Sequence, residues 1–181
     1  MAWSLPLCCE RFLLGDIMLS KEIVKMLNEQ IAKEMYASNL YIGIGAWCFA
    51  NRFNGAGTFL FDHAKEESNH AQKLIDYLIE TDSTVELEEI AKPEINIKDI
   101  LDAFEQTYAH ELKITKSIND LVNFTLENKD FSTFNFLQWY VSEQHEEEAL
   151  FRGIVDKIKL INDHGNGVFH VDQYIGTLGN K

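Results

Sequence analysis

The sequence has few residues that interrupt helices or cross-link a chain. Only two of its 181 residues are proline, at positions 6 and 93, so long stretches are free of the strongest helix breaker. It has three cysteines, two of them adjacent, and no Cys-x-x-Cys motif. This sparse, odd set argues against a disulfide framework and is typical of a reducing compartment. We therefore expect a cytoplasmic protein.

Positive charge and long apolar runs are also scarce. The formal net charge is −13, which disfavours nucleic acid as a partner and favours cations. Charged residues interrupt every apolar run well before the roughly 18 residues that a membrane-spanning helix needs, so no membrane contact is expected. Residues 1–17 are apolar but lack the basic start and the cleavage site of a signal peptide. We expect residues 1–17 to be an extension outside the fold and residues 18–181 to form one domain.

The sequence does contain long segments in which apolar residues recur at helical spacing. We expect four long helices at residues 21–50, 57–80, 97–128 and 131–162, and a short fifth helix at 168–178. Ser20 is a natural N-cap for the first. The connection at 81–96 is long for a helix bundle, and such a crossover makes the second and third helices parallel. The sequence therefore predicts an all-α four-helix bundle with one long crossover.

Polar residues interrupt the apolar stripe of each long helix. One lies in the first helix, two lie three residues apart in the second, one lies in the third, and two lie three apart in the fourth. They are Glu34, Glu67, His70, Glu111, Gln144 and Glu147. Positions 34, 67 and 70 recur at 111, 144 and 147, an offset of 77 in each case (111 − 34, 144 − 67, 147 − 70). The chain thus repeats a helix pair at the level of the polar residues that interrupt its apolar stripes.

Several carboxylates in one apolar core repel each other unless a multivalent cation neutralises them. An oxygen-rich set with one imidazole suits iron or manganese and allows zinc. Di-iron carboxylate bundles use one Glu from each of two helices and Glu-x-x-His from each of the other two. Here Gln144-x-x-Glu147 replaces the second Glu-x-x-His, so the second metal is expected to bind more weakly. A non-catalytic bundle whose polar residues only fix helix register would show the same pattern without binding metal.

Three runs of residues resemble the bacterial non-haem ferritins, members of the ferritin-like di-iron family. Residues 134–148 (FNFLQWYVSEQHEEE) resemble their fourth-helix signature, Glu66-Glu67-Ser68-Asn69-His70 their second helix, and residues 27–36 their first. The resemblance extends from Met18 to about Tyr174. It implies a ferritin-like bundle and a homo-oligomeric, 24-subunit shell for iron storage and iron homeostasis. It also implies a ferroxidase, which oxidises Fe(II) with dioxygen or hydrogen peroxide before the ferric mineral is stored.

The resemblance also implies which residues hold iron. The implied ligands are Glu34, Glu67 and His70 for the first iron; Glu67 as a bridge and Glu111, with Gln144 alongside, for the second; and Glu66, Glu143, Glu146 and Glu147 for a third. Tyr41 resembles the family's site tyrosine, which hydrogen-bonds a ligand. From the residues alone, the acidic run 146–148 is also typical of a solvated surface.

Related families fit the sequence less well. A haem-containing bacterioferritin typically has Met after the second-helix ligand, where this chain has Ser68, so no haem is expected. A DNA-coating mini-ferritin is disfavoured by the acidic charge, and a rubrerythrin by the absence of Cys-x-x-Cys. We expect core positions for four aromatic residues, Trp47, Phe59, Phe136 and Trp139. We expect surface or supporting positions for the remaining histidines, His63, His110, His145, His164 and His170.

Overall fold

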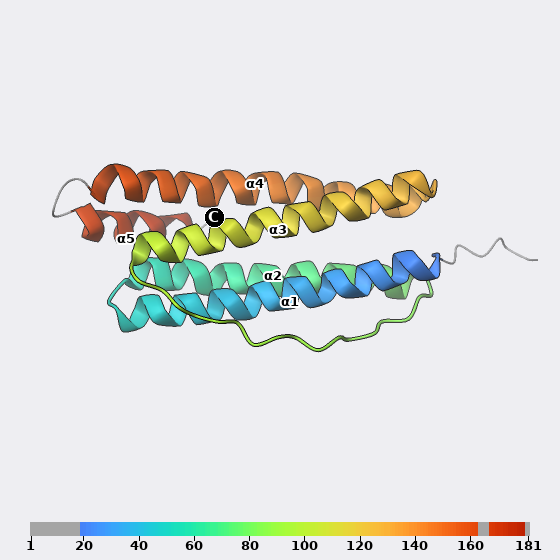
Figure 1. Ribbon diagram of the computed structural model, residues 1–181, viewed down its shortest axis with the longest axis horizontal. Coiled ribbons are helices and arrows are strands. Elements are labelled where there is room, and N and C mark those ends of the chain that lie inside the picture. The colour runs from blue at the N-terminus through green and yellow to red at the C-terminus, as the bar shows by residue number, and fades with distance from the viewer. Residues whose placement is uncertain (1–18, 163–166, 180–181) are drawn as a thin grey trace, which may run out of the picture.

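The structure is a computed structural model that describes residues 19–162 and 167–179. Within these residues the chain forms four long helices and one short one (Figure 1). Their bounds are α1 Lys21–Ala50, α2 Asn54–Glu80, α3 Ile100–Glu127, α4 Phe131–Asn162 and α5 Gly167–Leu178. The predicted fold class, an all-α bundle with a long crossover and a short fifth helix, is confirmed. None of the helices in these ranges is long and apolar enough to cross a membrane.

The long helices form two antiparallel pairs, α1 with α2 and α3 with α4, each joined by a short turn (Figure 1). The segment that connects the two pairs along the chain, which we call the crossover segment (residues 81–99), has no regular structure and runs alongside α1. Asn28 of α1 fastens this segment, because its Nδ2 donates to the Thr84 carbonyl at 3.1 Å and its Oδ1 accepts from the Glu86 N–H at 2.9 Å. The crossover returns the chain to the far end of the bundle, so that α3 runs parallel to α2.

The helix starts differ from the prediction at α2 and α3, and by one residue at α5, which begins at Gly167 rather than at residue 168. Ser20 caps α1 as expected, accepting from the Ile23 N–H at 3.2 Å. Helix α3 begins at Ile100 rather than at residue 97, because Asp99 is its N-cap and accepts from the Asp102 N–H at 2.8 Å. Helix α2 begins at Asn54 rather than at residue 57.

Helix α2 has no side-chain cap of its own, and α5 supplies one. The Asp172 carboxylate accepts from the backbone N–H groups of Gly55 at 3.1 Å and Ala56 at 2.9 Å. The two backbones also meet closely, since a Cβ on Gly55 would lie 2.0 Å from the Asp172 carbonyl oxygen and one on Gly176 would lie 2.9 Å from the Gly55 Cα. Glycine at both positions therefore lets α5 pack directly against the start of α2.

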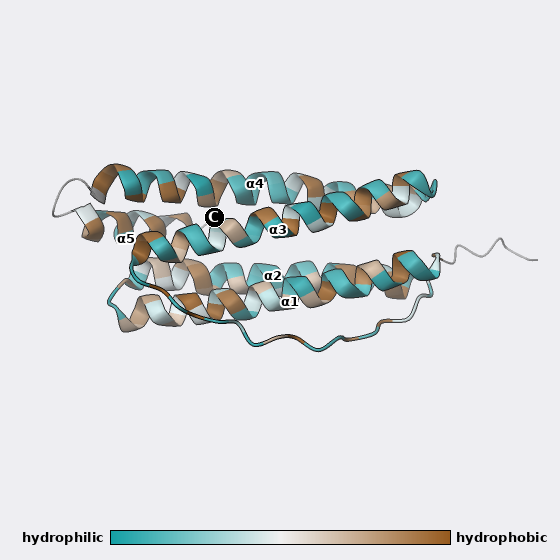
Figure 2. Cartoon of the chain, in the orientation of Figure 1, coloured by the Kyte–Doolittle hydropathy of each residue, from teal (hydrophilic) through white to brown (hydrophobic). Residues whose placement is uncertain are grey.

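Polar and apolar residues alternate around each long helix (Figure 2), and the apolar ones form two buried clusters. One cluster lies toward α5 and includes Phe59, Phe104 and Phe151. The other lies toward the start of α1 and includes Leu27 and Leu137. The buried polar residues that interrupt the helical stripes lie between these clusters, so the apolar core is divided by a polar layer.

The expected core positions of the aromatic residues are only partly correct. Phe59 is fully buried, and Trp47 and Phe136 are partly buried against the two clusters. The prediction was wrong for Trp139, which is 37% exposed. Trp139 precedes the buried Tyr140 and therefore points about 100° away from it around α4. Its ring is covered instead by the Lys73 ammonium group, 4.3 Å from the ring centroid.

Candidate metal centre

Three helices place carboxylates in the polar layer. Glu34 of α1, Glu67 of α2 and Glu111 of α3 are each at most 1% exposed, and His70 follows Glu67 by one helical turn. These are four of the residues that interrupt the helical stripes in the sequence. Full burial of three acidic groups is costly when no lysine or arginine of the described residues lies at hydrogen-bonding distance, which makes the site a candidate for binding a cation.

Glu34, Glu67 and His70 form the first group of candidate ligands. Their ligand atoms all lie within 4.8 Å of one another, and His70 Nδ1 is 3.3 Å from Glu67 Oε2. The Oε2 atoms of Glu34 and Glu67 are buried and have no hydrogen-bond partner within the described residues. An unpaired buried acceptor costs about 1–3 kcal/mol, and more when it is charged. The two free oxygens beside an imidazole therefore fit a divalent metal ion.

The electrostatics of the metal-free site agree with this fit. Burial, reinforced by the charge of Glu67, raises the pKa of Glu34 to about 8. Burial also raises the pKa of Glu111 to about 7, and it raises that of Glu67 well above its ordinary value, with the charge of Glu111 adding to the effect. Without a cation, burial thus favours the protonated forms of these carboxyl groups. A bound metal ion would replace those protons.

Glu111 has a different environment from Glu34, although the two occupy equivalent positions in the two halves. The Tyr41 hydroxyl donates to Glu111 Oε1, and Gln144 Nε2 lies 3.3 Å from Glu111 Oε2 as a second donor. The hydroxyl of Thr115 donates to Gln144 Oε1 at 3.1 Å, which turns the amide nitrogen toward Glu111. Burial raises the pKa of Tyr41 well above its ordinary value, so the phenol remains a donor.

A second group of candidate ligands consists of His63, Glu66 and Glu147, whose ligand atoms also lie within 4.8 Å of one another. His63 Nε2 is 3.4 Å from Glu147 Oε2, and Nδ1 is 3.5 Å from Glu66 Oε2. Both ring nitrogens are buried without a hydrogen bond in the described part of the chain. Burial alone would lower the pKa of His63, but interaction with Glu147 and Glu66 raises it overall. This imidazole is therefore suited to a cation or a proton between carboxylates.

The four glutamates expected around a third iron do meet at one place. A pocket of about 330 Å³ is lined by His63 together with Glu66, Glu143, Glu146 and Glu147. Glu143 also approaches His70, with its Oε1 3.9 Å from Nε2. The pocket thus adjoins the first group of ligands.

His63 is the residue of this pocket that the sequence reasoning missed. It was expected at a surface or supporting position, and the structure buries it between Glu66 and Glu147. A signal existed, because His63 precedes Glu67 by four residues and therefore shares its helix face. Among the other histidines, His145 and His170 are exposed, His110 is partly buried, and His164 lies outside the described residues.

Comparison with known proteins agrees with this geometry. The family model described as a ferritin-like domain matches residues 24–161. The chain is 70% identical over 161 residues to a bacterial non-heme ferritin of Campylobacter jejuni, covering 89% of this chain and 96% of that protein. The chain belongs to the bacterial non-haem ferritins.

More distant ferritins share the sequence and the fold. A bacterial non-heme ferritin of Escherichia coli is 44% identical over 161 residues, covering 89% of this chain and 98% of that protein. Among solved structures, an open-pore ferritin of the archaeon Archaeoglobus fulgidus matches with a TM-score of 0.86 at 35% identity, covering 88% of this chain and 98% of that one. The ferritin fold expected from the sequence is thus shared with experimentally determined structures.

Proposed function

We propose that this ferritin is a ferroxidase and an iron-storage protein that oxidises Fe(II) inside each helix bundle and keeps the ferric product in a shell. The observation that carries the proposal is the pair of buried, unpartnered oxygens of Glu34 and Glu67 beside His70. Membership of the ferritin family supports iron as the ion. Iron is the substrate and the cargo of the protein.

The proposed ligands follow the groups in the structure. Glu34, Glu67 and His70 would hold the first iron, and Glu67 would extend to a second iron held by Glu111. Gln144 would lie beside the second iron as a neutral neighbour. The adjoining pocket of about 330 Å³ would receive a third iron. Its ligands would be His63, Glu66, Glu143, Glu146 and Glu147.

The chemistry needs two Fe(II) ions side by side, at a two-metal spacing of roughly 3.5–4 Å. Together they supply two electrons to dioxygen or hydrogen peroxide. The protein holds Glu67 between the two positions, keeps Glu111 in place through the Tyr41 hydroxyl, and releases the protons of its carboxyl groups as iron binds. The second position lacks an imidazole and would hold iron more weakly, which suits onward transfer to the third position.

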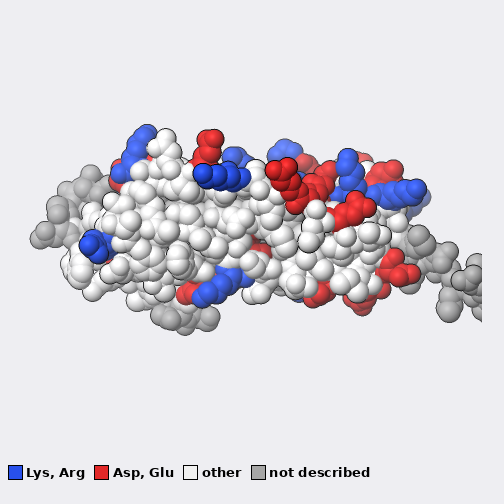
Figure 3. All heavy atoms as spheres, turned by 90° about the horizontal axis from the view of Figure 1, so that it is seen from below, with Lys and Arg blue, Asp and Glu red and all other residues white. Residues whose placement is uncertain are grey.

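Ferritins form homo-oligomeric shells, and we propose that this one contains 24 copies, lies in the cytoplasm and is built from residues 18–181. Large apolar residues are exposed on α1, α2 and the crossover segment, including Ile42, Ile79 and Leu87. Figure 3 shows that much of the face on the crossover side carries no charged side chain, despite the net charge of −13. Contact with other subunits would cover such surface.

The proposal is tested by anaerobic loading with Fe(II), followed by air, with near-ultraviolet absorbance and particle size recorded together. We expect rapid oxidation in a large particle, slowed at least about tenfold in Glu67→Ala and His70→Ala through loss of metal affinity. Glu80→Ala, an exposed change on the same helix, should behave as wild type. Equal, slow oxidation in all four proteins would refute the centre, and a small particle would refute storage.

A further inference from the structure

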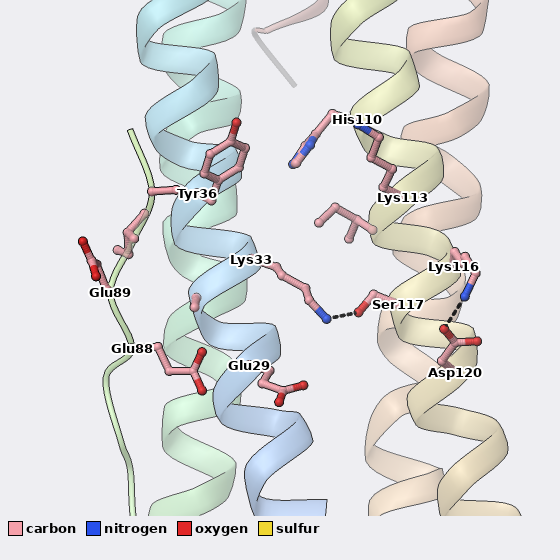
Figure 4. A pocket seen from close by; sticks show the side chains of 14 residues that line it. Glu29, Lys33, Tyr36, Glu88, Glu89, His110, Lys113, Lys116, Ser117 and Asp120 are labelled. Carbon is pink, nitrogen blue, oxygen red and sulfur yellow. Dashed lines mark hydrogen bonds and ion pairs between the residues drawn. The ribbon is translucent and has the colours of Figure 1, made fainter. Parts of the chain in front are cut away.

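A chain of hydrogen bonds connects Glu34 to the outside of the bundle. Gln30 Nε2 donates to Glu34 Oε1 at 2.8 Å, the Ser117 hydroxyl donates to Gln30 Oε1 at 2.6 Å, and Lys33 Nζ donates to Ser117 Oγ at 2.7 Å. Gln30 is completely buried. Lys33 is exposed on the wall of a pocket of about 600 Å³ between α1, α3 and the crossover segment, where Figure 4 shows its bond to Ser117. We call Gln30, Ser117 and Lys33 the Gln30 chain.

The hydrogen bonds of the Gln30 chain all run from donor to acceptor in the same direction, from Lys33 toward Glu34. A lysine ammonium group only donates, so Ser117 Oγ accepts from Lys33 and gives its single hydrogen to Gln30. The Gln30 amide oxygen therefore faces Ser117, and the amide nitrogen faces Glu34. With the opposite amide orientation, two oxygens would face each other in a buried site, and the Ser117 hydrogen would face an N–H group.

This direction leaves the two oxygens of Glu34 unequal. Oε1 accepts a directed N–H bond, whereas Oε2 is buried, unpartnered and part of the first ligand group. Glu111, its equivalent in the second half, has donors at both oxygens instead. The position equivalent to Gln30 is Thr107, whose hydroxyl donates to the Ala103 carbonyl of its own helix. The glutamate of the first half therefore receives its amide donor from its own helix, one turn before it, whereas the amide beside Glu111 is Gln144 of α4.

We propose that Gln30 is a positioning residue of the first iron site, and that Ser117 and Lys33 orient it so that Glu34 binds metal through Oε2 alone. The proposal rests on the iron centre proposed above. Partners that orient a ligand typically change metal affinity about 10–100-fold when they are removed. Gln30 would thereby set the affinity of the first site without touching the metal.

The test is an anaerobic Co(II) titration followed through the visible spectrum of the bound ion, which reports its coordination. Gln30→Leu keeps the side-chain size but removes the donor, and we expect Co(II) affinity to fall about 10–100-fold with a changed spectrum. Ser117→Ala keeps Gln30 but removes its orienting donor, and a smaller loss is expected. Lys116→Met is the matched control, because Lys116 lines the same pocket and pairs with Asp120 instead (Figure 4).

Each outcome has one meaning. Wild-type affinity and spectrum in both Gln30→Leu and Ser117→Ala would overturn the positioning role. If Gln30→Leu fails to assemble, as judged by size exclusion, Ser117→Ala decides alone. Glu34→Ala separates this inference from the proposed function: if it binds Co(II) as wild type does, the iron centre itself is wrong.

Discussion

Glu34, Glu67 and Glu111 are acids that folding removes from water, and this makes the metal-free protein sensitive to pH. Their unfolded pKa is near 4.5, whereas folding raises the pKa of Glu34 to about 8 and that of Glu111 to about 7. At a pH between the unfolded and the folded pKa values, the folded state binds more protons than the unfolded state. The free energy of unfolding therefore falls as pH rises. We predict that the melting temperature of chelator-treated protein decreases from about pH 5 to pH 8.

Two comparisons check the cause of that decrease. Glu34→Gln removes one of the titrating groups and should make the dependence shallower, and a divalent metal ion should restore stability at the upper end. A melting temperature that is flat or rises over this range would contradict the assigned burial. Because the carboxyl groups act together, the slope of the whole curve is the quantity to compare.

The sequence indicates the candidate ligands better than it indicates the residues that support them. Glu34, Glu67 and Glu111 stand out because each breaks an apolar stripe, and a carboxylate at such a position needs an explanation. Gln30 lies four residues before Glu34 on the same face, but a glutamine there has no charge to attract notice. Its role depends on Ser117, 87 positions away. No local pattern records that contact.

Helix α5 stabilises α2, because Asp172 of α5 caps the N-terminus of α2. We predict that Asp172→Ala lowers the free energy of unfolding by about 1 kcal/mol, the typical effect of losing an N-cap. Chemical denaturation of the assembled protein measures this change, with Asp156→Ala, an exposed change on α4, as the control. Equal losses in the two variants would mean that the cap contributes nothing specific.

The helix bounds show what local sequence can predict. The bounds of α1 and α4 were predicted correctly, because their ends coincide with changes in periodicity and with turn residues. Helix α2 starts earlier than expected because its cap comes from α5, which is distant in sequence. Helix α3 starts later because Asp99 was read as part of the helix rather than as its cap. Predicting the start of α2 correctly requires tertiary information, whereas the start of α3 has a local signal in the sequence.

For the whole molecule, the proposed domain limits lead to a deletion experiment. The two apolar clusters and the candidate ligands lie within residues 19–175. We predict that a chain beginning at Met18 keeps the melting temperature, particle size and iron oxidation of the full chain. Loss of assembly in the shortened protein, with its helix content retained, would show that residues 1–17 belong to the shell. The number of subunits depends on surfaces that meet between copies, and a single chain's periodicity does not encode that number directly.

The crossover segment also separates folding into two stages, formation of each helix pair and docking of the two pairs. Each antiparallel pair is joined by a short turn and can form from local contacts, which is fast, whereas docking one pair on the other closes a longer loop. That docking step brings Glu34 and Glu67 of one pair against Glu111 of the other. A metal ion or a proton would therefore be needed at the moment the halves meet. We expect divalent metal to speed the last stage of folding more than the first, so that cargo also serves as an assembly aid.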